Sequence, residues 1–350
     1  MISKGAMTNK YINYIIACET NRLKAQNDPF IKHGYMGMCL FLFEMYEITL
    51  SESYYKSAQN FLQLSCASIK RGSKVNVFDG LSGIGLAVVY LHKKKYITGN
   101  IYQILKNIDN EIYRNVINEI DYKQDFSTHG HEEALIDVAL YMIERLKVCS
   151  LPQIEEEIIK LFVNKIINLL YQCHDYAFYL EPIPYTSNYK LARFIFLLGK
   201  AYSIDMCTDR VLHIWEEARS TVLAQLPYLD CNKVLLLFAL TDLQKKIPGD
   251  KKLCDIIATL KSCISIKQIV YNEISADAMS MQSGLPVILD VILRMNLPLT
   301  QTDIVLLENK VKNSSYYNME YDRIIENKFV GLNGILCYIL SHLKINRFYG

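Results

Sequence analysis

Two kinds of apolar segment alternate along the chain. One kind is apolar on nearly every side and opens at or near a glycine, as in "GLSGIGLAVVYLHKK" from Gly80. The other carries apolar residues at three- and four-residue spacing with charged residues opposite, as in "PQIEEEIIKLFVNKIINLLYQC" from Pro152. The first pattern predicts a helix that is buried on every side, and the second predicts a helix with one buried face. Strand patterns are nearly absent, so the sequence predicts an all-α protein.

The glycine-led segment recurs about every 50 residues. The stretch from position 130 to position 284 is 154 residues long, which fits three such units and predicts two copies without glycine inside it. The seven predicted anchors are Gly34, Gly80, Gly130, Ser187, Asn232, Gly284 and Gly331. An inner and an outer helix in each unit predict a closed α/α toroid of about seven helix pairs, formed as a single domain over residues 1–350.

Three glycines stand close together at the start of one inner helix. Gly80, Gly83 and Gly85 lie within a stretch of six residues, although glycine inside a helix costs about 1 kcal/mol relative to alanine. This cluster predicts tight loops and a close approach of backbones near the centre of the ring. It also predicts that the first N–H groups of the helix face the centre, where an anion or a peptide carbonyl could dock.

Composition excludes several classes of protein. The net charge is +2 with scattered basic residues, which argues against a nucleic-acid-binding surface. No apolar run approaches the roughly 20 residues that a bilayer requires, so we expect no membrane span. The ten cysteines include no Cys-x-x-Cys pair and follow no disulfide framework, and the N-terminus reads as an amphipathic helix, not a signal peptide. We therefore expect a cytoplasmic protein.

The repeated Gly-x-x-Gly-Ile pattern, as in "GLSGIG" and "GLNGIL", resembles that of the lanthionine synthetase C-like family. The resemblance extends from Gly34 to Leu343. It implies an α/α toroid that closes thioether rings in ribosomally made peptides, by adding a cysteine thiol to dehydroalanine or dehydrobutyrine. It also implies a zinc ion held by a cysteine before the sixth inner helix and by a Cys-His pair before the seventh glycine. A histidine before an earlier inner helix is implied to handle protons.

The chain departs from the family pattern at these positions. Phe329 and Val330 stand where the Cys-His pair is expected, and Met281 stands at or near the expected cysteine. Thr186 stands where the proton-handling histidine is expected. We therefore predict no zinc and no other cofactor. The single Cys-His pair of the chain, residues 173–174, offers at most two ligands and is expected to pack at the end of an outer helix, with a metal site as the alternative.

Polar residues recur just before or after the anchor positions. In a toroid several of them would converge at the centre, and we predict His129 and Asp79 as an acid–base pair from neighbouring inner helices. The predicted substrate-binding residues are His33, His131, Asp230 and Gln282. The alternative is that Asp79 caps its helix and that the histidines make local hydrogen bonds. The run of lysines at 93–95 is expected to interact favourably with a helix dipole.

Three functions fit these patterns. The first is a thioether-forming peptide cyclase that works without zinc by positioning its substrate. The second is a non-catalytic toroid that binds a precursor peptide or a partner modifying enzyme such as a dehydratase. The third is a glycosidase or lyase, which would need paired carboxylates. Glu132 and Glu133 would point apart on a helix, so that activity would require the ring to bring Asp79 and Asp230 together.

Overall fold

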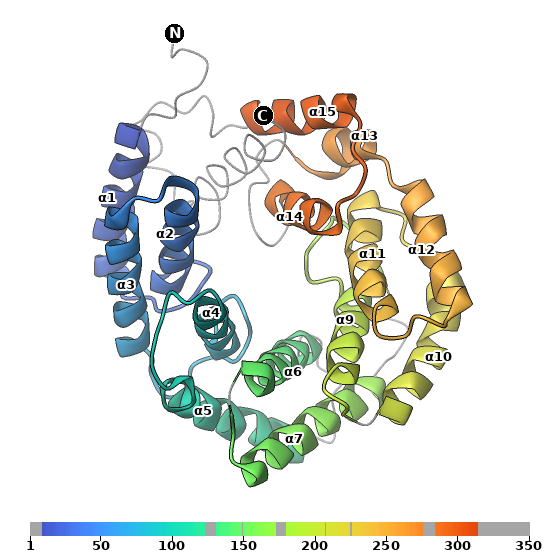
Figure 1. The fold of residues 1–350 in the computed structure, drawn as a ribbon, viewed down its shortest axis with the longest axis horizontal. Helices are drawn as coiled ribbons and strands as arrows, with labels where there is room; N and C mark the ends of the chain where they lie inside the picture. The colour runs from blue at the N-terminus through green and yellow to red at the C-terminus, as the bar shows by residue number, and fades with distance from the viewer. Residues whose placement is uncertain are drawn as a thin grey trace.

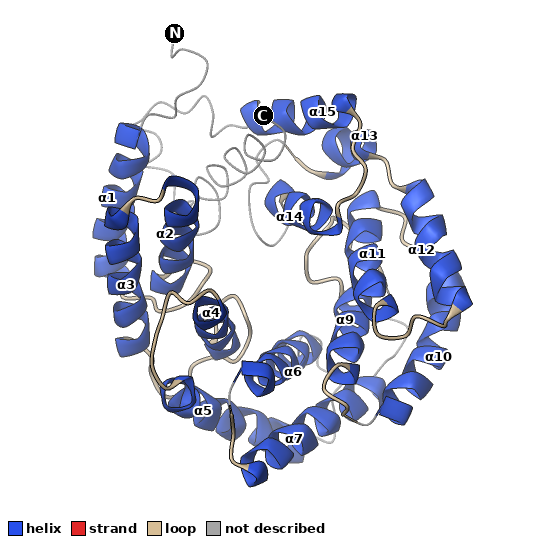
Figure 2. Cartoon of the chain, viewed as in Figure 1, coloured by secondary structure: helices blue, strands red, loops and turns tan. Residues whose placement is uncertain are grey.

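The computed structural model describes residues 9–122, 131–148, 150–172, 180–206, 208–224, 226–275 and 284–313. In these ranges the regular secondary structure is entirely helical, and the helices form an inner and an outer layer around a ring (Figures 1 and 2). The prediction of an all-α toroid is confirmed. None of the helices in the same ranges is both long and apolar enough to cross a bilayer.

Six inner and six outer helices alternate along the described part of the chain. The inner helices are α2 (Tyr35–Thr49), α4 (Leu81–Lys93), α6 (His131–Val148), α9 (Lys190–Tyr202), α11 (Asp230–Gln244) and α14 (Leu285–Met295). The outer helices are α3 (Glu52–Ala67), α5 (Ile101–Tyr122), α7 (Gln153–Gln172), α10 (Thr208–Ala224), α12 (Lys251–Cys263) and α15 (Gln301–Lys312). Helix α1 (Asn9–Gln26) precedes the first inner helix, and the short α13 (Ile266–Gln268) leads into the π-helix η1 (Ile269–Glu273).

The predicted anchors mark the starts of inner helices where a glycine is present. Gly34, Gly80 and Gly284 are the N-cap residues of α2, α4 and α14. In the two units without glycine the prediction is less accurate, because apolar spacing locates a helix but not its first residue. Helix α9 begins three residues after Ser187, and α11 begins before Asn232, which lies in its first turn. Gly130 and Gly331 lie outside the described residues.

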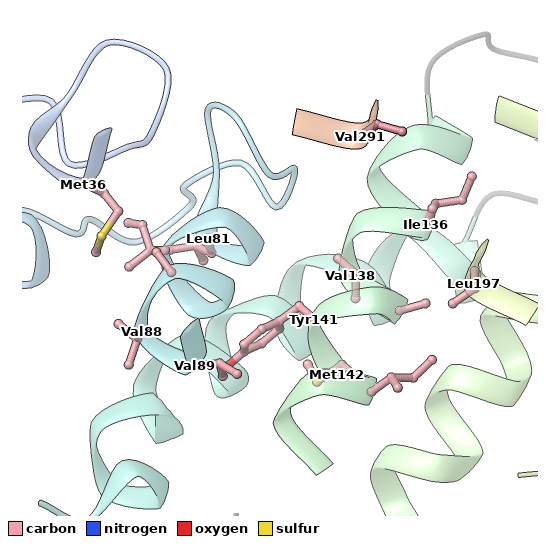
Figure 3. Close-up of a cluster of buried hydrophobic side chains, with 14 of the residues drawn as sticks. Met36, Leu81, Val88, Val89, Ile136, Val138, Tyr141, Met142, Leu197 and Val291 are labelled. Carbon is pink, nitrogen blue, oxygen red and sulfur yellow. The ribbon is translucent and has the colours of Figure 1, made fainter. Parts of the chain in front are cut away.

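Buried side chains of the described residues form two hydrophobic clusters, and the larger one contains residues of all six inner helices. Figure 3 shows Met36 of α2, Leu81 of α4, Tyr141 of α6, Leu197 of α9 and Val291 of α14 in the same cluster. Each of these residues is at most 8% exposed. The apolar surface removed from water, at about 25 cal/mol per Å², is what holds neighbouring units together.

Two glycines of α4 are required by the packing. A Cβ atom at Gly83 would overlap the backbone carbonyl of Val77, and a Cβ atom at Gly85 would overlap the ring of Tyr141 on α6. The backbone of α4 therefore approaches its preceding loop and its neighbouring inner helix more closely than any other residue would allow. This confirms the predicted close approach.

Candidate functional site

The N-terminal ends of neighbouring inner helices are joined by side chains. Asp137 of α6 is only 3% exposed, and it pairs with Arg193 of α9. Its Oδ2 atom also accepts a hydrogen bond from the Val77 N–H, at 2.8 Å, in the loop before α4. Burial raises the pKa of Asp137, although the Arg193 charge and the Val77 N–H act in the opposite direction. One carboxylate thus ties three successive units together.

Two consecutive glutamates in the first turn of α6 have separate partners. The Lys190 ammonium lies 3.5 Å from Oε2 of Glu132, and the side-chain amide of Asn188 donates to Oε2 of Glu133 at 3.0 Å. Burial raises the pKa of Glu133, and the positive charges of Arg193 and Lys190 oppose this rise. The two carboxylates bind different groups of the next unit, so they do not form a pair that could flank one bond.

Asp79 lies one residue before the N-cap of α4. That N-cap residue is Gly80, so Asp79 does not occupy the capping position that the alternative gave it. Instead, the partly exposed Asp79 carboxylate lies 4.0 Å from the Lys32 ammonium, which comes from the preceding unit. We call the set Lys32, Asp79, Glu132, Glu133, Asn188 and Lys190 the N-terminal rim.

Asp79 and His129, the predicted acid–base pair, come before α4 and α6 in the sequence. These two helices are neighbours, since α4 packs on α6 through Gly85 and Tyr141. His129 and Gln282 lie outside the described residues, and His131 is the first residue of α6. The backbone carbonyl of His33 accepts a hydrogen bond from Arg22 at 3.2 Å. The pairing of His129 with Asp79 and the substrate contacts of the other residues therefore stay predictions.

Asp230 at the start of α11 is buried and uses both carboxylate oxygens within the protein. Lys233 donates to Oδ1 at 2.6 Å, and the backbone N–H of Ser265 donates to Oδ2 at 2.9 Å. These bonds give Asp230 a structural role, and contact with substrate stays a prediction. Helices α4 and α11 lie on opposite sides of the ring (Figure 1), so the ring does not bring Asp79 and Asp230 together as a glycosidase would require.

The first N–H groups of several inner helices already have partners, which corrects the prediction that they face the centre as a docking site. At α4 the N–H of Leu81 donates to the carbonyl of Lys74 at 2.9 Å. At α11 the N–H groups of Asp230 and Cys231 donate to Glu273, both at 2.8 Å. At α4 the loop before the helix folds back over its first turn, whereas at α11 the acceptor is a side chain of η1.

Two carboxylates that accept hydrogen bonds at the start of α11 were not predicted from the sequence. Glu273 lies in η1, and Glu181, from the loop before α9, accepts the Leu229 N–H at 2.6 Å. Both come from positions more than 40 residues away along the chain. No local spacing signals such a contact, because the packing of neighbouring units sets it.

The positions implied for zinc, Met281, Phe329 and Val330, lie outside the described residues, as do Cys173 and His174. Phenylalanine and valine carry no donor atom and methionine only a weak thioether, so this set does not fit zinc, which takes thiolate, imidazole or carboxylate ligands. Within the described ranges no three His, Cys, Asp or Glu side chains are arranged to hold a metal. The Thr186 hydroxyl accepts the Asn188 N–H at 3.3 Å and stabilises the turn before α9.

The C-terminal ends of the inner helices carry ion pairs between units. Lys93, the last residue of α4, pairs with Glu144 of α6, and Lys94 lies 2.7 Å from Glu47 of α2. Lys147 adds a second cation, 3.3 Å from Glu144. The lysines predicted to interact with a helix dipole are thus also partners of carboxylates on the neighbouring inner helices.

The sequence comparisons agree with this architecture. Residues 25–189 match the family model described as "Lanthionine synthetase C-like protein", a stretch that includes helices α2 to α7 and the loop before α9. No curated protein matches the chain. The glycine-led repeat, the helical ring and this match lead to one conclusion: residues 25–189 of the chain are similar to the lanthionine synthetase C-like family.

Proposed function

We propose that the chain acts in the maturation of a ribosomally made, lanthipeptide-type peptide, by holding the precursor at the N-terminal rim and closing thioether rings without zinc. The match of residues 25–189 to the lanthionine synthetase C-like family supports a peptide as the substrate. A reducing cytoplasm would suit the reaction, since it keeps the peptide thiols free.

The observation that carries the proposal is the mixed chemistry of the N-terminal rim. Lys32, Lys190 and Asn188 offer donors, while Asp79 and Glu132 offer acceptors, and all five come from loops or first turns of neighbouring units. An extended peptide presents alternating N–H and C=O groups, so a rim with both kinds of partner suits it.

The proposed reaction is an addition without oxidation or reduction. The peptide thiol gives its proton to a base, its sulfur forms a bond to Cβ of a dehydroalanine, the Cα=Cβ π bond breaks, and Cα takes up a proton. A base is needed because a thiol with a pKa near 8.5 is mostly protonated at neutral pH. Asp79, with His129 as its predicted partner, would accept that proton, and the rim would hold the reacting groups together.

A second candidate function is a non-catalytic scaffold that binds a precursor peptide or a modifying enzyme such as a dehydratase. The observation in its favour is a contrast within the chain. Gly83 and Gly85, which the packing requires, are present, whereas the zinc positions hold Met281, Phe329 and Val330. This contrast is expected of a chain that keeps the fold without the metal chemistry.

The first experiment measures zinc in the purified, untagged protein by elemental analysis after dialysis, before and after zinc is offered. We expect no zinc in either sample. About one zinc per chain would contradict the metal-free proposal, because zinc of that stoichiometry requires a site of three or four ligands.

The second experiment uses a synthetic peptide with one cysteine and one dehydroalanine. Binding is measured by fluorescence anisotropy, and ring closure by mass spectrometry of peptide whose remaining thiols have been alkylated. D79N should slow ring closure by about a hundredfold, the usual contribution of a general base, with binding retained. D255N, at an exposed position on α12, is the matched control and should match the unsubstituted protein in both assays.

The outcomes separate the two candidates. Binding with ring closure supports the cyclase, and binding without ring closure supports the scaffold. A protein that neither binds nor cyclises the peptide contradicts the cyclase and the peptide-binding scaffold.

A further inference from the structure

Helix α7 exposes three large apolar side chains on one face. Ile154 is 75% exposed, Ile158 50% and Leu161 68%. Their spacing of four and then three residues aligns them along one side of the helix. Elsewhere in the described ranges no helix exposes three large apolar side chains on one face. Such a stripe on an outer helix costs free energy in water and marks a surface of interaction.

The stripe borders a cavity of about 260 Å³ between α5 and α7. Apolar and aromatic parts of its wall come from Tyr102, Tyr113, Leu151, Ile158 and Ile159, and polar side chains line the rest. Ile158 belongs to both the stripe and the cavity wall. The apolar surface therefore continues from the exposed face of α7 into a hollow beside it, where a projecting side chain of a neighbour could be received.

The charges along α7 favour one kind of neighbour. Its first turns carry Glu155, Glu156 and Glu157, and basic residues, Lys160 and Lys165, follow. Glu157 is 60% exposed beside the stripe, and Lys165 continues the stripe four residues after Leu161. Two parallel copies of this helix would place like charges together. Two antiparallel copies place the acidic end of each beside the basic part of the other.

We propose that α7 is a self-association surface, on which a second copy of this chain packs its own α7 in antiparallel orientation about a twofold axis. An axis midway between Ile158 and Leu161 places Ile158 of each copy against Leu161 of the other. The same register places Ile154 against the aliphatic stem of Lys165, and Glu157 within one helical turn of Lys165 in the second copy. Leu161 then covers Ile158 at the cavity wall.

The dimer that this surface forms is weak and reversible. Only one helix of each copy takes part, and it lies on the convex outer layer of the ring (Figure 1). The buried area falls at the low end for specific interfaces, where association depends strongly on concentration.

The test is sedimentation equilibrium of the full-length protein from micromolar to millimolar concentration. For the unsubstituted protein we expect an average mass that rises from one chain toward two. L161E should raise the dissociation constant of the dimer by about tenfold or more, because each copy loses a leucine that the dimer buries. V305E, on the outer helix α15 at a side chain that is 44% exposed, is the matched control and should dimerise like the unsubstituted protein. A monomer at every concentration, or a dimer that L161E leaves unchanged, would overturn the proposal.

A charge exchange tests the antiparallel orientation. K165E places like charges together and should weaken the dimer by about tenfold, since the twofold axis repeats the repulsion. E157K/K165E restores opposite charges between the copies and should restore the dimer. Circular dichroism establishes that each variant is folded. A folded double variant as weak as K165E would overturn the antiparallel register.

Discussion

At the scale of single residues, two glycines of α4 are required by the groups that pack against the helix and not by the helix itself. A helix interior disfavours glycine, yet a methyl group at Gly83 would overlap the carbonyl of Val77. The overlapped group is backbone, so relief would require the loop before α4 to move. That loop also holds Asp79, a residue of the N-terminal rim, and Val77, whose N–H binds Asp137. Gly83 and the candidate site therefore depend on the same backbone path.

G83A should therefore lower the free energy of unfolding by about 3 kcal/mol, the upper range for overpacking in a core. Gly249 provides the matched control, because a Cβ atom there meets no atom within 4 Å. G249A should change the free energy of unfolding by less than about 1 kcal/mol in either direction. Urea denaturation followed by circular dichroism measures both. Equal losses in the two variants would mean that the loop adapts to a methyl group without cost.

At the scale of helices, one carboxylate fixes the start of α12 and attaches it to its neighbour. Asp250 is the N-cap, and its side chain accepts the Leu253 N–H at 3.1 Å. It also accepts hydrogen bonds from the indole of Trp215 and from Arg219 on α10, both at 3.0 Å. Burial would raise the pKa of Asp250, but these hydrogen bonds and the Arg219 charge outweigh it and lower that pKa.

D250A should cost about 2 kcal/mol of unfolding free energy, because it removes an N-cap and leaves the buried Trp215 indole N–H without its acceptor. D255A removes a carboxylate from an exposed position of the same helix and should cost less than about 0.5 kcal/mol. Thermal unfolding monitored by circular dichroism compares them. A D255A variant as unstable as D250A would show that the cap and the indole contact contribute little.

At the scale of the whole molecule, the ring is held at both ends by side chains that cross from one unit to the next. Asp137 does so with Arg193 near the N-terminal rim, and Glu144 of α6 does so with Lys93 of α4 at the C-terminal ends. Burial would raise the pKa of Glu144, yet the hydrogen bond from Lys93 and the charge of Lys147 lower it overall. A carboxylate with a lowered pKa stabilises the fold above its unfolded-state pKa, and this contribution is lost as the pH falls through the folded-state pKa.

E144Q should therefore be less stable than the unsubstituted protein by about 1 kcal/mol at neutral pH, and this difference should shrink as the pH falls below the usual glutamate range near 4.5. Urea titrations across the acidic range measure the difference. In a K93M background, which keeps the aliphatic stem, E144Q should lose the part of its pH-dependent effect that comes from Lys93, while Lys147 still pairs with the carboxylate. A difference that stays constant with pH, or that survives unchanged in K93M, would contradict the role of this ion pair.

The sequence by itself determined the alternation of inner and outer helices and their repeat of about 50 residues. Each helix is a local feature, since helical periodicity acts within a few turns. The glycines of α4 are visible in the sequence, but only the packing against Val77 and Tyr141 shows why they are required. The absence of donor side chains at Met281, Phe329 and Val330 is equally a property of the sequence.

Only the tertiary structure decided which groups of distant units meet. Asp137 joins Val77 and Arg193, and Glu273 takes the first N–H groups of α11, because the ring brings together residues that lie more than 40 positions apart. The stripe of α7 is another such case. Helix α7 has apolar residues on its buried face as well as in the stripe. The packing of the neighbouring helices decides which of these residues remain exposed to water.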